Sequence, residues 1–210
     1  MGYSNPAHFF KLKTTRNCIK YCSHIERMSY TEYKEMRTLY DFSKTDMVKY
    51  NAIITRIYSE LSDIDFEKVN AVFLTNGLLD FVKNDEKYVE RLIHEIEGNL
   101  QENAVVLIKR HPRDDTHYQF DSKIKAIELN QQIPGEVILP YIDGKKIIMM
   151  LTTSMLLYFD GKKCEKELLY FQDVYDENRK NVTYLKYPSK EEIEEILKKN
   201  GWLDVVIKKI

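Results

Sequence analysis

The sequence predicts an α/β fold with a parallel sheet, and two observations lead to this prediction. From residue 69 onward, short apolar runs alternate with amphipathic segments, the pattern typical of βαβ units. Some of these runs are apolar at every position, as expected for parallel strands covered on both faces. Residues 66–210 are therefore expected to form one α/β domain, and residues 1–65 a mainly helical N-terminal region.

Helical periodicity is the main signal in the N-terminal region. Apolar residues recur there at intervals of three and four, which predicts a helix with one face in the core. The members of this stripe are Met47, Tyr50, Ile53, Ile54, Ile57, Tyr58 and Leu61. No strand pattern precedes residue 69, so this region is expected to have no sheet of its own.

The first βαβ unit is expected over residues 71–109. Residues 71–75 and 104–109 read as strands, and between them residues 85–97 predict a helix that a Gly-Asn pair ends. The apolar residues that share one face of this helix are Val89, Leu92, Ile93 and Ile96. The two strands of such a unit pair in parallel.

Further apolar runs at 124–129, 136–139 and 146–151 continue the pattern. The last of them is apolar enough to predict a strand at the centre of the sheet. Near the C-terminus, Ser189 and Glu192 have the spacing of a capping box. The helix that they begin is expected to close the domain.

Composition limits the functions that the chain can have. The net charge is −1, from 32 basic and 33 acidic residues, so no nucleic-acid partner is expected. The cysteines Cys18, Cys22 and Cys164 are odd in number, which favours free thiols in the cytoplasm. Cys18 and Cys22 have only His24 nearby and no evident fourth ligand, so no structural metal site is expected. No apolar run reaches the length of a membrane span.

The apolar run at 105–108 is followed by two cations and then by His111, Pro112 and Arg113. A buried strand with this ending places an imidazole and a guanidinium at the carboxyl edge of the sheet, where open α/β folds bind ligands. Proline fixes its own φ and favours an extended His111, so the backbone sets the direction of the ring. These residues predict a site that faces phosphate.

Thr152, Thr153 and Ser154 follow the run at 146–151. Hydroxyl residues are preferred helix N-caps, and the amides of a first helical turn also bind anions. The triplet is therefore a second candidate for phosphate binding, with an ordinary N-cap as the alternative.

Four short blocks, at 73–78, 106–114, 133–138 and 151–154, resemble in their order the C-terminal nucleotide-binding half of bacterial lipooligosaccharide sialyltransferases, glycosyltransferase family 52. The resemblance implies a Rossmann-like domain of a GT-B glycosyltransferase. It also implies CMP-sialic acid as the donor substrate, a galactose-terminated glycan as the acceptor, inversion at the anomeric carbon, and no metal or other cofactor.

The same resemblance assigns roles to individual residues. His111 and Arg113 would meet the phosphate and assist departure of the nucleotide, and Glu136 would receive the ribose hydroxyls. The phosphate would also be held by the hydroxyl triplet Thr152, Thr153 and Ser154. Asn76 and Gly77 belong to the first block and are expected to line the substrate site.

The chain departs from the family in two respects. Phe81 stands where the family has the aspartate that acts as general base, so Asp80, or Asp85, would have to act in its place. Loss of a general base commonly lowers the rate about 100- to 10,000-fold. About 65 residues precede the first strand, too few for the acceptor domain of a GT-B enzyme, so a fragment, a truncated reading frame or a reduced relative is expected.

Three functions stay open at this stage. The first is a sialyltransferase-like enzyme that modifies a lipooligosaccharide or capsular glycan, in the cytoplasm or at the inner face of the bacterial membrane, as a monomer or a homodimer. The second is a catalytically silent nucleotide-binding or scaffolding module. The third is another GT-B transferase such as a teichoic-acid glycerophosphate polymerase, although Thr152, Thr153 and Ser154 lack the Asp-Tyr pair typical of that group.

Overall fold

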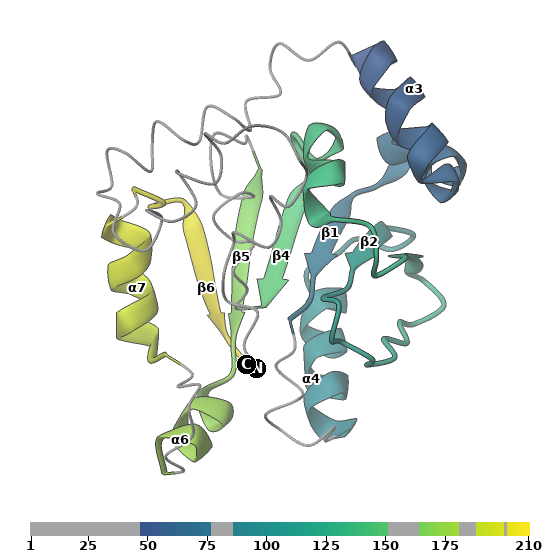
Figure 1. Cartoon of the computed structure of the whole chain (residues 1–210). Helices are drawn as coiled ribbons and strands as arrows, with labels where there is room; N and C mark the ends of the chain where they lie inside the picture. The colour runs from purple at the N-terminus through teal and green to yellow at the C-terminus, as the bar shows by residue number, and fades with distance from the viewer. Residues whose placement is uncertain (1–46, 77–85, 151–163, 181–187, 200) are drawn as a thin grey trace. The chain divides into compact units, whose positions relative to one another are not determined.

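Six strands form one parallel sheet in the computed structural model, which describes residues 47–76, 86–150, 164–180, 188–199 and 201–210 (Figure 1). The strand order is β3-β2-β1-β4-β5-β6, and every neighbouring pair is parallel. The strands are β1 (Ala71–Leu74), β2 (Val105–Lys109), β3 (Lys125–Leu129), β4 (Lys146–Met150), β5 (Glu165–Tyr170) and β6 (Val205–Lys209). This Rossmann-like order confirms the predicted α/β fold with a parallel sheet.

Helices connect the strands over much of the described chain. The α-helices are α3 (Met47–Ile57), α4 (Glu86–Glu97), α6 (Gln172–Lys180) and α7 (Lys190–Lys199). The 3₁₀ helices are η5 (Ser59–Asp63), η6 (Phe66–Lys68) and η8 (Gly135–Tyr141). The connection from β2 to β3 differs, because residues 110–124 are fully described and contain no helix.

The centre of the sheet is β1 with its neighbours β2 and β4, as their apolar sequences predict. All four residues of β1 are buried, and so are the last four of β2 and of β4. Leu74 is in register with Lys109 of β2 and with Met149 of β4. The chain therefore leaves all three strands at the same edge of the sheet.

Helix α4 confirms the expected crossover of the first βαβ unit. It is described from Glu86 and ends at Glu97, immediately before the Gly-Asn pair, as predicted. Leu92 and Ile96 are fully buried, while Val89 and Ile93 are partly buried against the same core. The predicted apolar face is therefore correct.

The described part of the N-terminal region consists of α3 and η5, and residues 1–46 lie outside the described residues. Ile54, Tyr58 and Leu61 belong to or pack against the core, as predicted. Ile53 and Ile57 were wrongly assigned to the stripe, since they are 58% and 62% exposed. They lie on the outer flank of the helix, because a 3.6-residue repeat cannot place every apolar position on one face.

The C-terminal part differs from the prediction in three places. The apolar run at 136–139 forms the 3₁₀ helix η8 and not a strand of the sheet. Strand β5 was not expected, and α7 does not close the domain, since β6 follows it. Gly201, with a φ of 72°, allows the chain to turn sharply after α7.

The predicted capping box at the start of α7 is present. The Glu192 amide donates to Ser189 Oγ at 3.1 Å, and the Ser189 amide donates to Glu192 Oε2 at 2.7 Å. Reciprocal bonds of this kind satisfy two amides that have no partner within the helix.

Candidate functional site at the carboxyl edge of the sheet

The site that the sequence predicts lies where β1, β2 and β4 end. Strands β1 and β4 are neighbours although they are distant in sequence, so the winding of the sheet reverses between them. In open α/β sheets, ligands bind outside the carboxyl ends of the strands at this reversal point. Thr75 and His111 follow β1 and β2 at this edge.

A direct contact joins the ends of β1 and β2. The backbone amide of His111 donates a hydrogen bond to Thr75 Oγ1 at 3.0 Å, and the Thr75 amide donates to the Lys109 carbonyl at 3.2 Å. Thr75 is 3% exposed. Its buried hydroxyl therefore fixes the point at which the His-Pro turn begins.

The turn itself is held by Asp114. The Asp114 amide donates to the His111 carbonyl at 2.9 Å. The carboxylate accepts hydrogen bonds from the Thr116 amide at 3.1 Å and from the Tyr118 hydroxyl at 2.8 Å. Asp114 is 3% exposed, so a buried and hydrogen-bonded carboxylate anchors a turn whose outer residues face solvent.

The environment of Tyr118 keeps its phenol protonated. Burial raises the pKa of the Tyr118 hydroxyl above its ordinary value, and the charge and hydrogen bond of Asp114 raise it further. The nearby hydroxyls of Thr116 and Thr75 act in the opposite direction and offset part of this rise in the pKa. The phenol therefore remains a donor to Asp114 throughout the neutral pH range.

The geometry also constrains the imidazole of His111. The Arg113 amide donates to His111 Nδ1 at 3.2 Å. A ring nitrogen that accepts a hydrogen bond carries no proton, so in the neutral ring the proton resides on Nε2. Arg113 itself is exposed. The turn can thus offer an imidazole N–H and a guanidinium to an anionic ligand.

The segment just before the third block of the family resemblance is tied to the same turn. The side-chain amide of Gln131 donates to the Asp114 carbonyl, and Lys109 Nζ donates to the Gln131 carbonyl at 3.3 Å. Gln131 lies two residues before the third block, which begins at residue 133 and contains Gly135, the first residue of η8. The backbone at Glu136 is described, while the placement of its side chain is outside what the structure describes.

The structure therefore brings together residues of the first two blocks, places Gln131 against the same turn two residues before the third block, and leaves the fourth outside the described residues. Asn76 lies next to Thr75 and is 9% exposed. Strand β4 ends at Met150, two residues before the hydroxyl triplet begins. The predicted residues that lie outside the described residues are Gly77, Asp80, Phe81, Asp85, Thr152, Thr153, Ser154, Cys18, Cys22 and His24.

Sequence reasoning did not single out Thr75, Asp114 or Tyr118 as site residues. Thr75 could have been found, because it follows its strand at the same edge as the His-Pro turn. The contact between Asp114 and Tyr118 has no comparable signal, since it depends on the path of an irregular connection.

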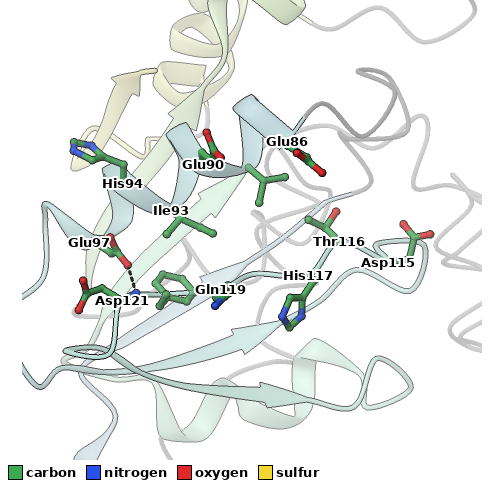
Figure 2. A pocket seen from close by; sticks show the side chains of 12 residues that line it. Glu86, Glu90, Ile93, His94, Glu97, Asp115, Thr116, His117, Gln119 and Asp121 are labelled. Carbon is green, nitrogen blue, oxygen red and sulfur yellow. Dashed lines mark hydrogen bonds between the residues drawn. The ribbon is translucent and has the colours of Figure 1, made fainter.

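A groove of about 810 Å³ lies between α4 and the residues that follow the turn. Figure 2 shows Glu86 and Glu90 on the helix and Asp115, Thr116 and His117 on the connection. Val89, Ile93 and Phe120 contribute apolar surface to the groove. Its described lining carries five carboxylates, those of Glu86, Glu90, Glu97, Asp115 and Asp121. The described lining contains neither lysine nor arginine, so it repels phosphate and does not suit the nucleotide.

Within the described residues, no group of three or more His, Cys, Asp or Glu side chains could hold a metal ion. Cys164 forms no disulfide, and its thiol donates to the Ile142 carbonyl at 3.3 Å. None of the described helices has the length and apolar character needed to cross a membrane.

No protein-family model, curated protein or solved structure matches this chain. The interpretation of the site therefore depends on its own residues and on the order of the four blocks.

Proposed function

We propose that this chain is a sialyltransferase-like glycosyltransferase that binds CMP-sialic acid at the carboxyl edge of its sheet. The acceptor in this proposal is a galactose-terminated lipooligosaccharide or capsular glycan. The domain would correspond to the C-terminal half of a GT-B enzyme, in which donor binding and acceptor binding belong to different domains.

The contact between Thr75 and His111 is the observation that carries the proposal. It ties the His-Pro turn at the end of β2 to the end of β1, and β1 is one of the two strands between which the winding of the sheet reverses, the place where sheets of this order bind nucleotides.

The chemistry of the turn suits a departing nucleotide. Cleavage of the bond between sialic acid and CMP leaves negative charge on the phosphate. A hydrogen bond from His111 Nε2 and the guanidinium of Arg113 would stabilise that charge. No metal is required for this step, because the two side chains supply the positive and hydrogen-bonding groups.

A second candidate function is nucleotide binding without turnover. Phe81 stands where the resemblance places the general base, and a phenyl ring cannot accept a proton. This candidate shares the CMP site with the first and differs from it in activity alone.

Thermal unfolding with CMP tests the nucleotide site. A ligand that binds only the folded state at 100 times its Kd stabilises it by about 2.7 kcal/mol, which for a chain of this size raises the Tm by about 5–10 °C. We expect this rise for the wild type and for His94→Ala, a control on the exposed side of α4. His111→Ala should reduce the rise by about half or more. No rise in the wild type at millimolar CMP contradicts the site.

Turnover distinguishes the two functions. We expect release of CMP from CMP-sialic acid to depend on added lactose, the simplest galactose-terminated acceptor, and to be lost in Asp80→Asn. Binding of CMP without any turnover would favour the silent module.

A further inference from the structure

Four residues at the His-Pro turn are linked by a chain of hydrogen bonds, in the order Thr75, His111, Asp114 and Tyr118. His111 donates through its amide to Thr75 Oγ1 at 3.0 Å, and Asp114 donates through its amide to the His111 carbonyl at 2.9 Å. The Tyr118 hydroxyl donates to Asp114 Oδ2 at 2.8 Å.

Three of the four residues in this chain of hydrogen bonds are buried. Thr75, Asp114 and Tyr118 are each 3% exposed, whereas His111 is partly exposed. The Tyr118 ring also packs edge-on against Phe73 of β1, with centroids 5.3 Å apart and an interplanar angle of 88°. Buried hydrogen bonds of this kind are costly to break, so the turn has one arrangement.

This arrangement determines what the imidazole can do. When Asp114 closes the turn, the Arg113 amide points at His111 Nδ1 at 3.2 Å. A proton on Nδ1 would place two N–H donors against each other. The neutral ring is therefore held in the tautomer that carries its proton on Nε2, the form that can donate to a phosphate oxygen.

We propose that Asp114 and Tyr118 are positioning residues that hold His111 in the Nε2–H tautomer. They do not touch the nucleotide, and they act through the closure of the turn. The biological use of the tautomer rests on the proposed function, since the donor is aimed at the phosphate of CMP. The tautomer itself can be measured without any ligand.

Long-range ¹H–¹⁵N correlation spectra of the full chain at about pH 8, where histidines are mostly neutral, report the tautomer of each imidazole. The signal that disappears in His111→Gln identifies His111. We expect its Nε2 to be protonated and its Nδ1 to be unprotonated in the wild type. Tyr118→Phe and Asp114→Asn should shift the signals toward a mixture of both tautomers.

Matched controls separate positioning from general loosening of the fold. Tyr141→Phe removes a hydroxyl that bonds Asn51, and Asp115→Asn alters the exposed neighbour of Asp114. Both should leave the His111 spectrum unchanged. If Tyr118→Phe does not fold, Thr75→Val takes its place as the disruptive variant, and Thr75→Ser, which keeps the hydroxyl, should restore the single tautomer.

Two results would overturn the proposal. The first is a wild-type His111 that shows a mixture of tautomers or a proton on Nδ1. The second is a folded Tyr118→Phe or Thr75→Val variant whose His111 spectrum is the same as that of the wild type. Adding CMP to the same samples separates this proposal from the proposed function. A single tautomer with no rise of the Tm contradicts the nucleotide site alone, and a mixed tautomer with a normal rise contradicts positioning alone.

Discussion

Lys146 Nζ lies 2.9 Å from Glu167 Oε1, which makes an ion pair between two neighbouring strands of the parallel sheet. The two side chains are 13% and 7% exposed. Glu165 also contacts Lys146, at 3.2 Å, but its side chain is 65% exposed. Burial lowers the pKa of Lys146, yet the hydrogen bonds and charges of Glu167 and Glu165 outweigh this effect and raise it overall.

This difference in burial predicts unequal costs for two similar substitutions. Glu167→Gln leaves a largely buried ammonium without its closest counter-charge and should lower the free energy of unfolding by about 3 kcal/mol. Glu165→Gln removes an exposed partner and should cost less than about 1 kcal/mol. Urea unfolding of both variants measures the difference, and equal costs would show that Glu167 adds little to the pair.

The charged residues at the start of β5 explain why this strand was not predicted from the sequence. The apolar runs of β1, β2 and β4 made these strands visible in the sequence. Strand β5 begins with Glu165, Lys166 and Glu167, and such a run reads as a solvated segment. Lys166 is nevertheless 3% exposed and bonds Asp204 at 2.5 Å. Its burial depends on a partner far along the chain, which sequence periodicity does not show.

The apolar run at 136–139 does not form a strand, and the sequence itself contains the reason. Pro134 precedes it and Pro140 lies inside η8. A proline cannot donate to a sheet ladder, so it is disfavoured in a central strand. At the site, the carboxyl-edge position of His111 was predictable from the strand before it. The closure by Asp114 and Tyr118 was not, because it depends on a connection without secondary structure.

Adjacent isoleucines of α3 provide a test of its orientation. Ile54 packs against the core, whereas Ile53 is 58% exposed. Ile54→Ala should therefore lower the free energy of unfolding by about 2 kcal/mol, and Ile53→Ala should change it by less than about 0.5 kcal/mol. Chemical denaturation of the two variants gives the comparison. A larger cost for Ile53→Ala than for Ile54→Ala would mean that Ile53, and not Ile54, lies on the side of α3 that packs against the core.

The capping box of α7 predicts a loss of stability when its hydroxyl is removed. Ser189→Ala deletes the acceptor of the Glu192 amide and should cost about 1 kcal/mol. Ser122→Ala serves as the control, since the Ser122 hydroxyl contacts a neighbouring exposed side chain and caps no described helix. Thermal unfolding should show a lower Tm for Ser189→Ala alone.

The buried tyrosine at the turn predicts sensitivity to alkaline pH. The folded state raises the pKa of Tyr118, so its phenol stays protonated above about pH 10, where the unfolded chain ionises. The resulting stability is fully present below about pH 10 and declines as the pH rises further, by up to about 1.4 kcal/mol per pH unit for this group. Urea unfolding between about pH 8 and pH 11 should show the decline, and Tyr118→Phe should make it less steep. An unchanged slope in a folded variant would mean that other groups cause it.

A comparison of CMP with cytidine tests whether the turn binds the phosphate itself. Hydrogen bonds to charged groups contribute about 1.5–3 kcal/mol, so His111→Ala and Arg113→Ala should each raise the Kd for CMP by about 10- to 100-fold. The Kd for cytidine, which has no phosphate, should stay within about twofold of the wild-type value. Arg113→Lys keeps the charge but loses the planar fork and should have an intermediate effect. Isothermal titration with both ligands gives these constants. Equal losses for CMP and cytidine would mean that the two side chains shape the pocket as a whole and do not contact the phosphate.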